Sequence, residues 1–123
     1  IVAKFLFELK VRLIDKSYFS DREIIFSEGD KSSGAYIIQE GSVSLSKKAE
    51  NGFVKDIAVL GVGKIIGEVS MITNQRYSVA ATAHSDGHAL VLEKEDFTKR
   101  LKSSDRVLGL ILESVIDRLR TTY

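Results

Sequence analysis

The segment from Gly67 to Ser78 contains the residues whose types and spacing are best suited to binding chemistry. Glu68 follows a glycine, residues 68–72 are long enough for one helical turn, and Arg76 comes a few residues later. The first amides of a helix have no internal partners and attract anions. A carboxylate accepts hydrogen bonds from hydroxyl groups, and a guanidinium neutralises a phosphate through charge-assisted bonds. Together these groups predict recognition of a ligand that has both a sugar and a phosphate.

The predicted ligand-binding set consists of Gly67, Glu68, Val69, Ser70, Arg76, Tyr77 and Ser78. Within it, Tyr77 either closes the pocket with its ring or donates its hydroxyl to the phosphate, and Ser78 is a second hydroxyl donor or a plain strand residue. Simpler roles also stay open: Gly67 as a turn glycine, Glu68 as the cap of a short helix and Arg76 as a solvated charge. In every case the chemistry is recognition, without a reacting side chain.

No arrangement typical of an enzyme is visible in the sequence. There are only two histidines, and neither a Ser/His/Asp set nor a pair of carboxylates stands out. The glycine-rich run 61–67 matches neither the triphosphate-binding nor the dinucleotide-binding spacing. His84, Asp86 and His88 alternate at strand spacing and would suit a metal in a cupin-like enzyme, but Asp86 and Gly87 are typical of a hairpin tip. We therefore predict a protein that is not an enzyme and has no metal site.

Length and composition indicate one domain with its own hydrophobic core, because the chain has 123 residues and 44% of them are hydrophobic. The formal charge is +1, from 18 basic and 17 acidic residues without a basic run, so no nucleic-acid surface is predicted. The lack of cysteine agrees with a reducing cytoplasm. No stretch is long and apolar enough for a membrane span. An opening Ile instead of Met suggests an excised fragment with its effector domain or protein outside it.

Hydrophobic spacing divides the chain into three parts. In the first part, 1–22, Phe5, Leu6, Leu9 and Leu13 lie at helical spacing and predict a helical segment. The second part, 23–92, predicts a β-sandwich or barrel whose strands are 24–26, 35–38, 42–46, 54–60, 78–83 and 89–92. The third part, 93–123, predicts two helices over 93–102 and 105–120, with Asp105 as the N-cap of the second.

Four motifs occur in order along the chain: Ile25 Phe26 Ser27 Glu28 Gly29 Asp30, then Ala35 Tyr36 Ile37 Ile38 Gln39 Glu40 Gly41 Ser42 Val43, then Gly67 Glu68 Val69 Ser70, then Leu90 Val91 Leu92 with Asp96 Phe97. In this order they resemble the cyclic nucleotide-binding domain family of kinase regulatory subunits, catabolite-activator-type transcription factors and gated channels. The resemblance implies a mainly β fold, a jelly-roll barrel or double-stranded β-helix, with one N-terminal and two C-terminal helices. It also implies that Glu68 holds a ribose hydroxyl, that the amides after Gly67 hold the cyclic phosphate, and that the last helix closes over the base.

The chain departs from the family pattern at one position. The family has an arginine ten residues after the glycine, where this chain has Tyr77. Arg76 lies one residue earlier, and neighbouring residues on a strand point to opposite faces. Arg76 can therefore replace the family's arginine only if the loop 73–75 is one residue tighter or a bulge turns its side chain inward. Without an arginine, affinity would fall by roughly one to two orders of magnitude. The hydroxyl of Ser78 is loosely associated with cyclic GMP in the family.

The leading hypothesis is a cytoplasmic regulatory sensor that binds a cyclic purine nucleotide, cyclic AMP (cAMP) rather than cyclic GMP (cGMP), and relays occupancy through its C-terminal helices. The nucleotide is the ligand, and no cofactor is predicted. Val107 and Leu110 widen the apolar stripe of the last helix, which fits a homodimer as well as a lid. The alternative is a degenerate member in which Tyr77 has replaced phosphate recognition and the barrel serves docking or dimerisation. The two hypotheses differ in whether Arg76 points into the barrel.

Overall fold

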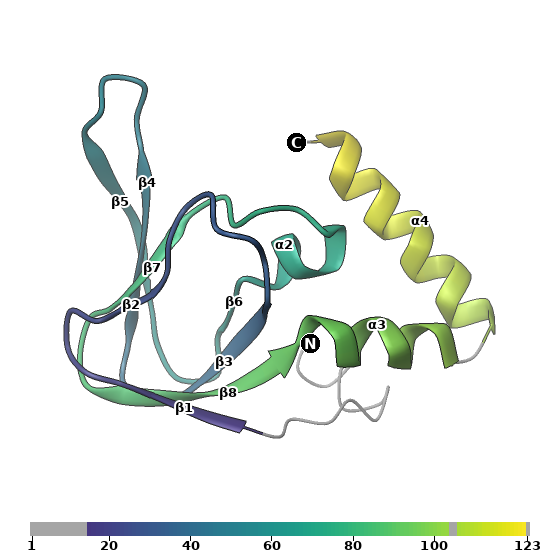
Figure 1. Ribbon diagram of the computed structural model, residues 1–123, viewed down its shortest axis with the longest axis horizontal. Helices are drawn as coiled ribbons and strands as arrows, with labels where there is room; N and C mark the ends of the chain where they lie inside the picture. The colour runs from purple at the N-terminus through teal and green to yellow at the C-terminus, as the bar shows by residue number, and fades with distance from the viewer. Residues whose placement is uncertain (1–14, 104–105, 123) are drawn as a thin grey trace.

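The structure, a computed structural model, describes residues 15–103 and 106–122. Its strands are β1 (Asp15–Phe19), β2 (Ile24–Phe26), β3 (Gly34–Glu40), β4 (Val43–Lys48), β5 (Val54–Leu60), β6 (Ile65–Ile66), β7 (Ala80–Ala83) and β8 (Gly87–Glu93). The helices in these residues are α2 (Glu68–Thr73), α3 (Lys94–Ser103) and α4 (Arg106–Thr122). Figure 1 shows the strands rolled together on one side of the molecule and α3 and α4 on the other.

The strands form two antiparallel sheets of four strands each. One has the order β1-β8-β3-β6 and the other β2-β7-β4-β5. The chain changes sheet at every connection between consecutive strands except the one from β4 to β5, as in a jelly roll. In Figure 1 the β4–β5 hairpin extends away from the helices. The predicted mainly β jelly-roll fold with C-terminal helices is confirmed.

Two hydrophobic clusters hold the barrel and its helices together. The larger fills the barrel and consists of Phe19, Phe26, Ile38, Val43, Ile66, Tyr77, Ala81, Ala83 and Ala89. The smaller consists of Ala35, Met71, Leu92 and Phe97, and it packs α2 and α3 against the end of the barrel. Because burial of apolar area is the main stabilising term in folding, Met71 anchors the short helix that follows Gly67.

The start of the chain differs from the prediction. Residues 15–19 form β1, which pairs with β8 from Asp15↔Val91 to Phe19↔Gly87, so the predicted helical segment 1–22 is wrong over this part. The predicted helix around Phe5 to Leu13 lies outside the described residues. Strand β1 escaped prediction because Asp15, Lys16 and Ser17 give no apolar alternation, and the strand is held by backbone pairing with β8.

The turn at Asp86 and Gly87 is not the tip of a hairpin, contrary to the sequence prediction. It leads from β7 in one sheet to β8 in the other. A Cβ at Gly87 would collide with the carbonyl of Glu40, so the glycine permits a close backbone approach. Nearby, His88 Nδ1 lies 3.3 Å from Glu40 Oε2. Within the described residues, no three His, Cys, Asp or Glu side chains gather as a metal ion would require.

The two predicted C-terminal helices are present as α3 and α4, with ends displaced by one or two residues. α4 lies beside α2 (Figure 1). Its Ile116 is buried, whereas four other apolar side chains along it are exposed: Val107, Leu110, Ile111 and Val115. The predicted N-cap, Asp105, lies outside the described residues. None of the helices in the described ranges has the length and hydropathy needed to cross a membrane.

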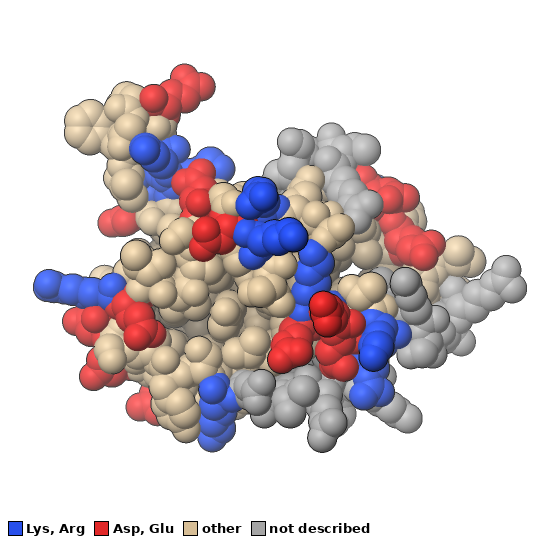
Figure 2. Space-filling model, in the orientation of Figure 1, with Lys and Arg blue, Asp and Glu red and all other residues tan. Residues whose placement is uncertain are grey.

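The surface shown in Figure 2 carries basic and acidic side chains in alternation. For example, Lys47 Nζ lies 3.8 Å from Glu28 Oε2. On α3, Arg100 Nε lies 3.8 Å from Oδ1 of Asp96, one helical turn away. This mixture agrees with the near-neutral formal charge of +1. On this face, the described residues therefore do not create the single-sign field that steers nucleic acid to a protein.

Candidate functional site

Gly67 separates β6 from α2, and its backbone is left-handed with φ of 79°. This conformation favours glycine because it has no Cβ. A Cβ at this position would lie 3.0 Å from Cε1 of Tyr77 and 3.2 Å from the carbonyl oxygen of Gly34. The glycine is therefore required by its backbone angle and by the close approach of the Tyr77 ring.

Glu68 is the first residue of α2 and its side chain is partly buried. Burial raises the pKa of the Glu68 carboxyl above its ordinary value of 4.5, while a hydrogen bond from its own backbone amide partly offsets this. Apart from that amide, no residue in the described ranges hydrogen-bonds or pairs with the carboxylate. Because a carboxylate has about four lone-pair sites, Glu68 retains acceptor capacity for hydroxyl groups of a ligand.

Replacement of Glu68 by glutamine is expected to raise the melting temperature at about pH 7. The raised pKa means that the folded state binds the proton more tightly than the unfolded state, so wild-type stability falls as pH rises above 4.5 through the raised pKa. The ionised carboxylate therefore carries a penalty at neutral pH that a neutral amide of the same shape lacks. Thermal unfolding of both proteins between about pH 3 and pH 7 measures the effect, which should vanish at the acidic end. A glutamine variant that is less stable at neutral pH would show that the charge is stabilised in the folded protein.

The amides of Glu68, Val69 and Ser70 belong to the first turn of α2 and have no carbonyl partners within the helix. The carbonyls of the same turn are occupied: Val69 accepts a bond of 2.7 Å from Thr73 Oγ1, and Ser70 accepts one of 2.9 Å from the Gln75 amide. Ser70 itself is buried. These bonds stabilise the turn, and its amide end includes Glu68 itself.

Tyr77 lies in the barrel core, with only 3% of its surface exposed. Its ring stacks on Phe26, with centroids 3.9 Å apart and planes inclined by 13°. Its hydroxyl donates to the Gly34 carbonyl at 2.7 Å and accepts from the amides of Ser33 and Gly34, each at 3.3 Å. The hydroxyl is thus engaged by the backbone at the start of β3, and the ring packs beside Gly67.

Arg76 and Ser78 lie on the outside, on either side of Tyr77. Arg76 is exposed, and its Nη1 donates to the carbonyl of Gly29 at 2.9 Å. Ser78 is also exposed, and its carbonyl accepts a bond of 3.0 Å from Lys47 Nζ. The structure therefore brings Gly67 and Tyr77 into contact, whereas the side chain of Arg76 is directed to the turn that follows β2.

Sequence reasoning did not include three residues that hold Tyr77: Phe26, Ser33 and Gly34. Phe26 contacts the ring, and the backbone of residues 33–34 contacts the hydroxyl. Gly34 also admits the close approach of β8, because a Cβ there would collide with the carbonyl of Leu92. The only signal in the sequence is the short apolar run that ends in Phe26, and it does not indicate which aromatic side chain stacks on it.

The arrangement of a left-handed glycine, a carboxylate and an open helical turn lies within a region that matches a known family. Residues 16–104 match the family model described as "Cyclic nucleotide-binding domain". The chain belongs to the cyclic nucleotide-binding domain family. The predicted resemblance is thereby confirmed, and the site around Glu68 lies inside the matched region of this cyclic nucleotide-binding domain.

The curated relatives of this cyclic nucleotide-binding domain include a cyclic AMP receptor protein and a kinase regulatory subunit. The chain is 29% identical over 109 residues to the cyclic AMP receptor protein of Thermus thermophilus, covering 85% of this chain and 50% of that protein. It is 33% identical over 97 residues to the cAMP-dependent protein kinase type II regulatory subunit of Drosophila melanogaster, covering 79% of this chain and 24% of that protein. The chain thus spans half the length or less of these two curated relatives.

Solved structures of similar domains share the fold. The cAMP-bound form of the EAL enzyme Bd1971 matches with a TM-score of 0.72 and 30% identity, over 88% of this chain and 29% of that one. The catabolite activator protein of Thermus thermophilus matches with a TM-score of 0.73 and 23% identity, over 99% of this chain and 56% of that one. At 23% identity, the similarity to the catabolite activator protein concerns the fold alone.

Proposed function

We propose that this chain is a regulatory sensor domain that binds a cyclic purine nucleotide, with cAMP preferred to cGMP. Glu68 accepts hydrogen bonds from the ribose, and the amides that follow Gly67 receive the cyclic phosphate. The role is binding rather than catalysis, and its setting is the cytoplasm. Membership of the family supports this proposal, as does the cAMP-bound state of a solved domain that is 30% identical.

The observation that carries the proposal is the partly buried Glu68 carboxylate, whose hydrogen-bond partner in the described residues is its own amide. Burial of a charged group without sufficient partners is unfavourable. Such groups concentrate at functional sites, where a ligand provides the missing donors. A ribose provides hydroxyl donors, and the open amides of α2 lie in the same turn of the chain.

The phosphate would be held mainly by backbone amides, because neither candidate side chain is free to meet it. The Tyr77 hydroxyl is engaged by Gly34, and Arg76 donates to Gly29. One charge-assisted hydrogen bond contributes about 1.5–3 kcal/mol. We therefore propose a sensor whose affinity is roughly one to two orders of magnitude below that of members with the interior arginine.

Occupancy would reach the C-terminal helices through α2. Met71 of α2 and Phe97 of α3 share one hydrophobic cluster, and Leu112 of α4 packs against it. A ligand that tightens the turn after Gly67 would shift Met71 and change how α3 and α4 pack. An effector outside this chain would then respond to the position of α4.

Titration calorimetry of the purified domain with cAMP and with cGMP, each to millimolar concentration, tests the proposal. Saturable binding of one nucleotide per chain is expected, with the larger association constant for cAMP. A larger constant for cGMP would reverse the assigned ligand preference. No heat with either nucleotide, together with no change in melting temperature, would refute the sensor function.

A second candidate function is a protein-interaction module that has lost nucleotide binding. The burial of Tyr77 and the outward position of Arg76 favour it, because together they leave the barrel interior without the family's cation. The exposed apolar residues of α4, among them Ile111, would then form a homodimer contact.

Ile111→Asp is expected to convert a dimer of this kind into a monomer, as measured by sedimentation equilibrium. Val62→Asp is the matched control, since Val62 is another exposed apolar residue and lies in the loop before β6. A wild-type domain that stays monomeric at high concentration would remove dimerisation as its function. A dimer that survives Ile111→Asp but not Val62→Asp would place the contact at the barrel instead.

A further inference from the structure

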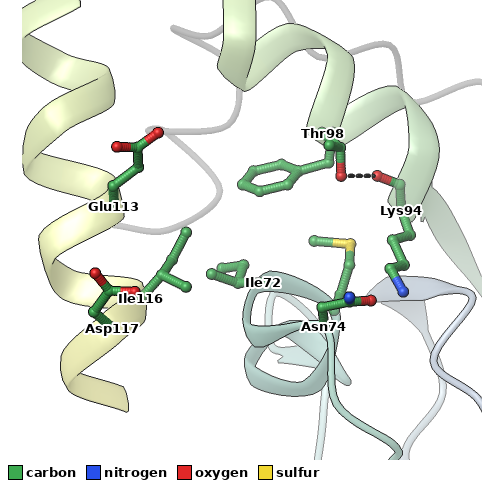
Figure 3. A pocket seen from close by; sticks show the side chains of 9 residues that line it. Ile72, Asn74, Lys94, Thr98, Glu113, Ile116 and Asp117 are labelled. Atoms are coloured by element: carbon green, nitrogen blue, oxygen red, sulfur yellow. Dashed lines mark hydrogen bonds between the residues drawn. The ribbon is translucent and has the colours of Figure 1, made fainter. Parts of the chain in front are cut away.

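A cavity on the helical side of the molecule is lined by residues of α2, α3 and α4. Its volume is about 490 Å³, which is within the range of small-molecule sites. Figure 3 shows Ile116 of α4 and Ile72 of α2 pointing toward each other across it. Met71 and Phe97 complete an apolar floor, and both are 3% exposed. The floor is therefore fixed by the core, whereas the cavity itself is open to a ligand.

The walls of the cavity carry opposite charges. On α4, Glu113 and Asp117 lie one helical turn apart and flank Ile116. On the opposite wall Lys94, at the start of α3, extends toward Asn74 (Figure 3). No ion pair or hydrogen bond joins these three charged side chains to another side chain of the part of the chain that the structure describes. An acidic wall and a basic wall thus face each other over an apolar floor.

We propose that this cavity binds a small zwitterion with an apolar body, of the kind represented by a dipeptide of large apolar residues. Its ammonium group binds Glu113 and Asp117, and its carboxylate binds Lys94 and the side-chain amide of Asn74. Its apolar side chains cover the floor between Ile72 and Ile116. A ligand with only one charge would leave the charged groups of one wall without a partner. An uncharged ligand would leave the charged groups of both walls without partners.

This assignment is independent of nucleotide binding. Glu68 is not among the lining residues of the cavity, which takes Met71, Ile72 and Asn74 from the far end of α2 and beyond. Occupancy would nevertheless involve α2, α3 and α4 together, because each contributes lining residues. A bound zwitterion would hold α4 at its present distance from the barrel.

The test is an NMR titration of the ¹⁵N-labelled domain, without nucleotide, using the dipeptide Leu-Phe as the probe. Amide shifts are expected to concentrate at the cavity, around Ile72, Phe97 and Ile116. N-acetyl-Leu-Phe, which lacks the ammonium, should bind about tenfold more weakly. Leu-Phe-amide, which lacks the carboxylate, should lose a similar factor.

Variants of the walls complete the experiment as a cycle. The double change Glu113→Gln and Asp117→Asn should weaken Leu-Phe about tenfold but leave N-acetyl-Leu-Phe unchanged, because the same interaction is removed from either side. Lys94→Gln should weaken Leu-Phe about tenfold but leave Leu-Phe-amide unchanged, because that probe has no carboxylate for Lys94 to bind. Equal binding of all probes would overturn the assignment of the walls, and no shifts at the cavity with Leu-Phe would overturn the site itself. Neither result would bear on calorimetry with cAMP.

Discussion

Tyr77→Ala is expected to lower the free energy of unfolding by about 3–5 kcal/mol, the cost typical of truncating a buried aromatic residue. The ring stacks on Phe26 and fills the space beside Gly67, so its removal leaves a cavity in the barrel core. It also removes the hydroxyl that the Gly34 carbonyl and the amides of residues 33–34 bind. Urea unfolding at equilibrium measures the change.

Tyr77→Phe is the matched control because it keeps the ring and removes only the hydroxyl. Its expected cost is smaller, about 1–3 kcal/mol, since the backbone around Gly34 loses one buried partner. A cost below about 1 kcal/mol for Tyr77→Ala would contradict the assignment of Tyr77 to the core. In that case the ring would be free to turn toward a ligand, as one interpretation of the sequence proposed.

Glu68→Ala is expected to weaken cAMP binding by roughly 10-fold to 100-fold, because it removes hydrogen bonds between a charged acceptor and the ribose. The matching change in the ligand is 2′-deoxy-cAMP, which lacks the ribose hydroxyl. The wild-type domain should bind the deoxy compound more weakly than cAMP by a similar factor. The Glu68→Ala variant should bind both compounds equally, since the contact is already absent.

Two controls make the Glu68 result specific. Glu23→Ala removes an exposed carboxylate outside the site and should leave cAMP binding unchanged. Glu68→Gln keeps the shape of the side chain and tests whether the charge itself is needed. If Glu68→Ala lost affinity for cAMP but still discriminated against 2′-deoxy-cAMP, another residue would hold the ribose hydroxyl.

Most of the fold followed from hydrophobic spacing and turn residues. The strands around Phe26 and Ile57 were predicted with their observed bounds, because each is a short segment with β-branched residues between turn residues. The strands β1 and β6 were not, for different reasons. Residues 15–19 lack apolar alternation, and β6 has only two residues, Ile65 and Ile66, between glycines. Both are defined by backbone pairing with strands distant in the sequence, which local patterns do not encode.

The candidate site was predicted less completely than the fold. The glycine, the carboxylate and the short helix at 67–72 were local features, and the structure places them as expected. The orientations of Arg76 and Tyr77 were left open, because alternation on a strand says that they diverge but not which of them faces inward. That choice depends on Phe26 of β2 and Gly34 of β3, which lie far from Tyr77 in the sequence but contact it in the fold. Contacts between residues so far apart in the sequence form only in the tertiary structure and are not encoded in local patterns.

The most direct test of the central claim is an NMR titration of the ¹⁵N-labelled domain with cAMP. The account predicts that the largest amide shifts occur at Glu68, Val69 and Ser70, since the amides of Val69 and Ser70 receive the phosphate and Glu68 makes the ribose contact beside them. It predicts smaller shifts at Met71 and Phe97, through which α2 packs on α3. Saturating cAMP that leaves residues 67–70 unshifted, or that shifts only residues remote from α2, would contradict the claim.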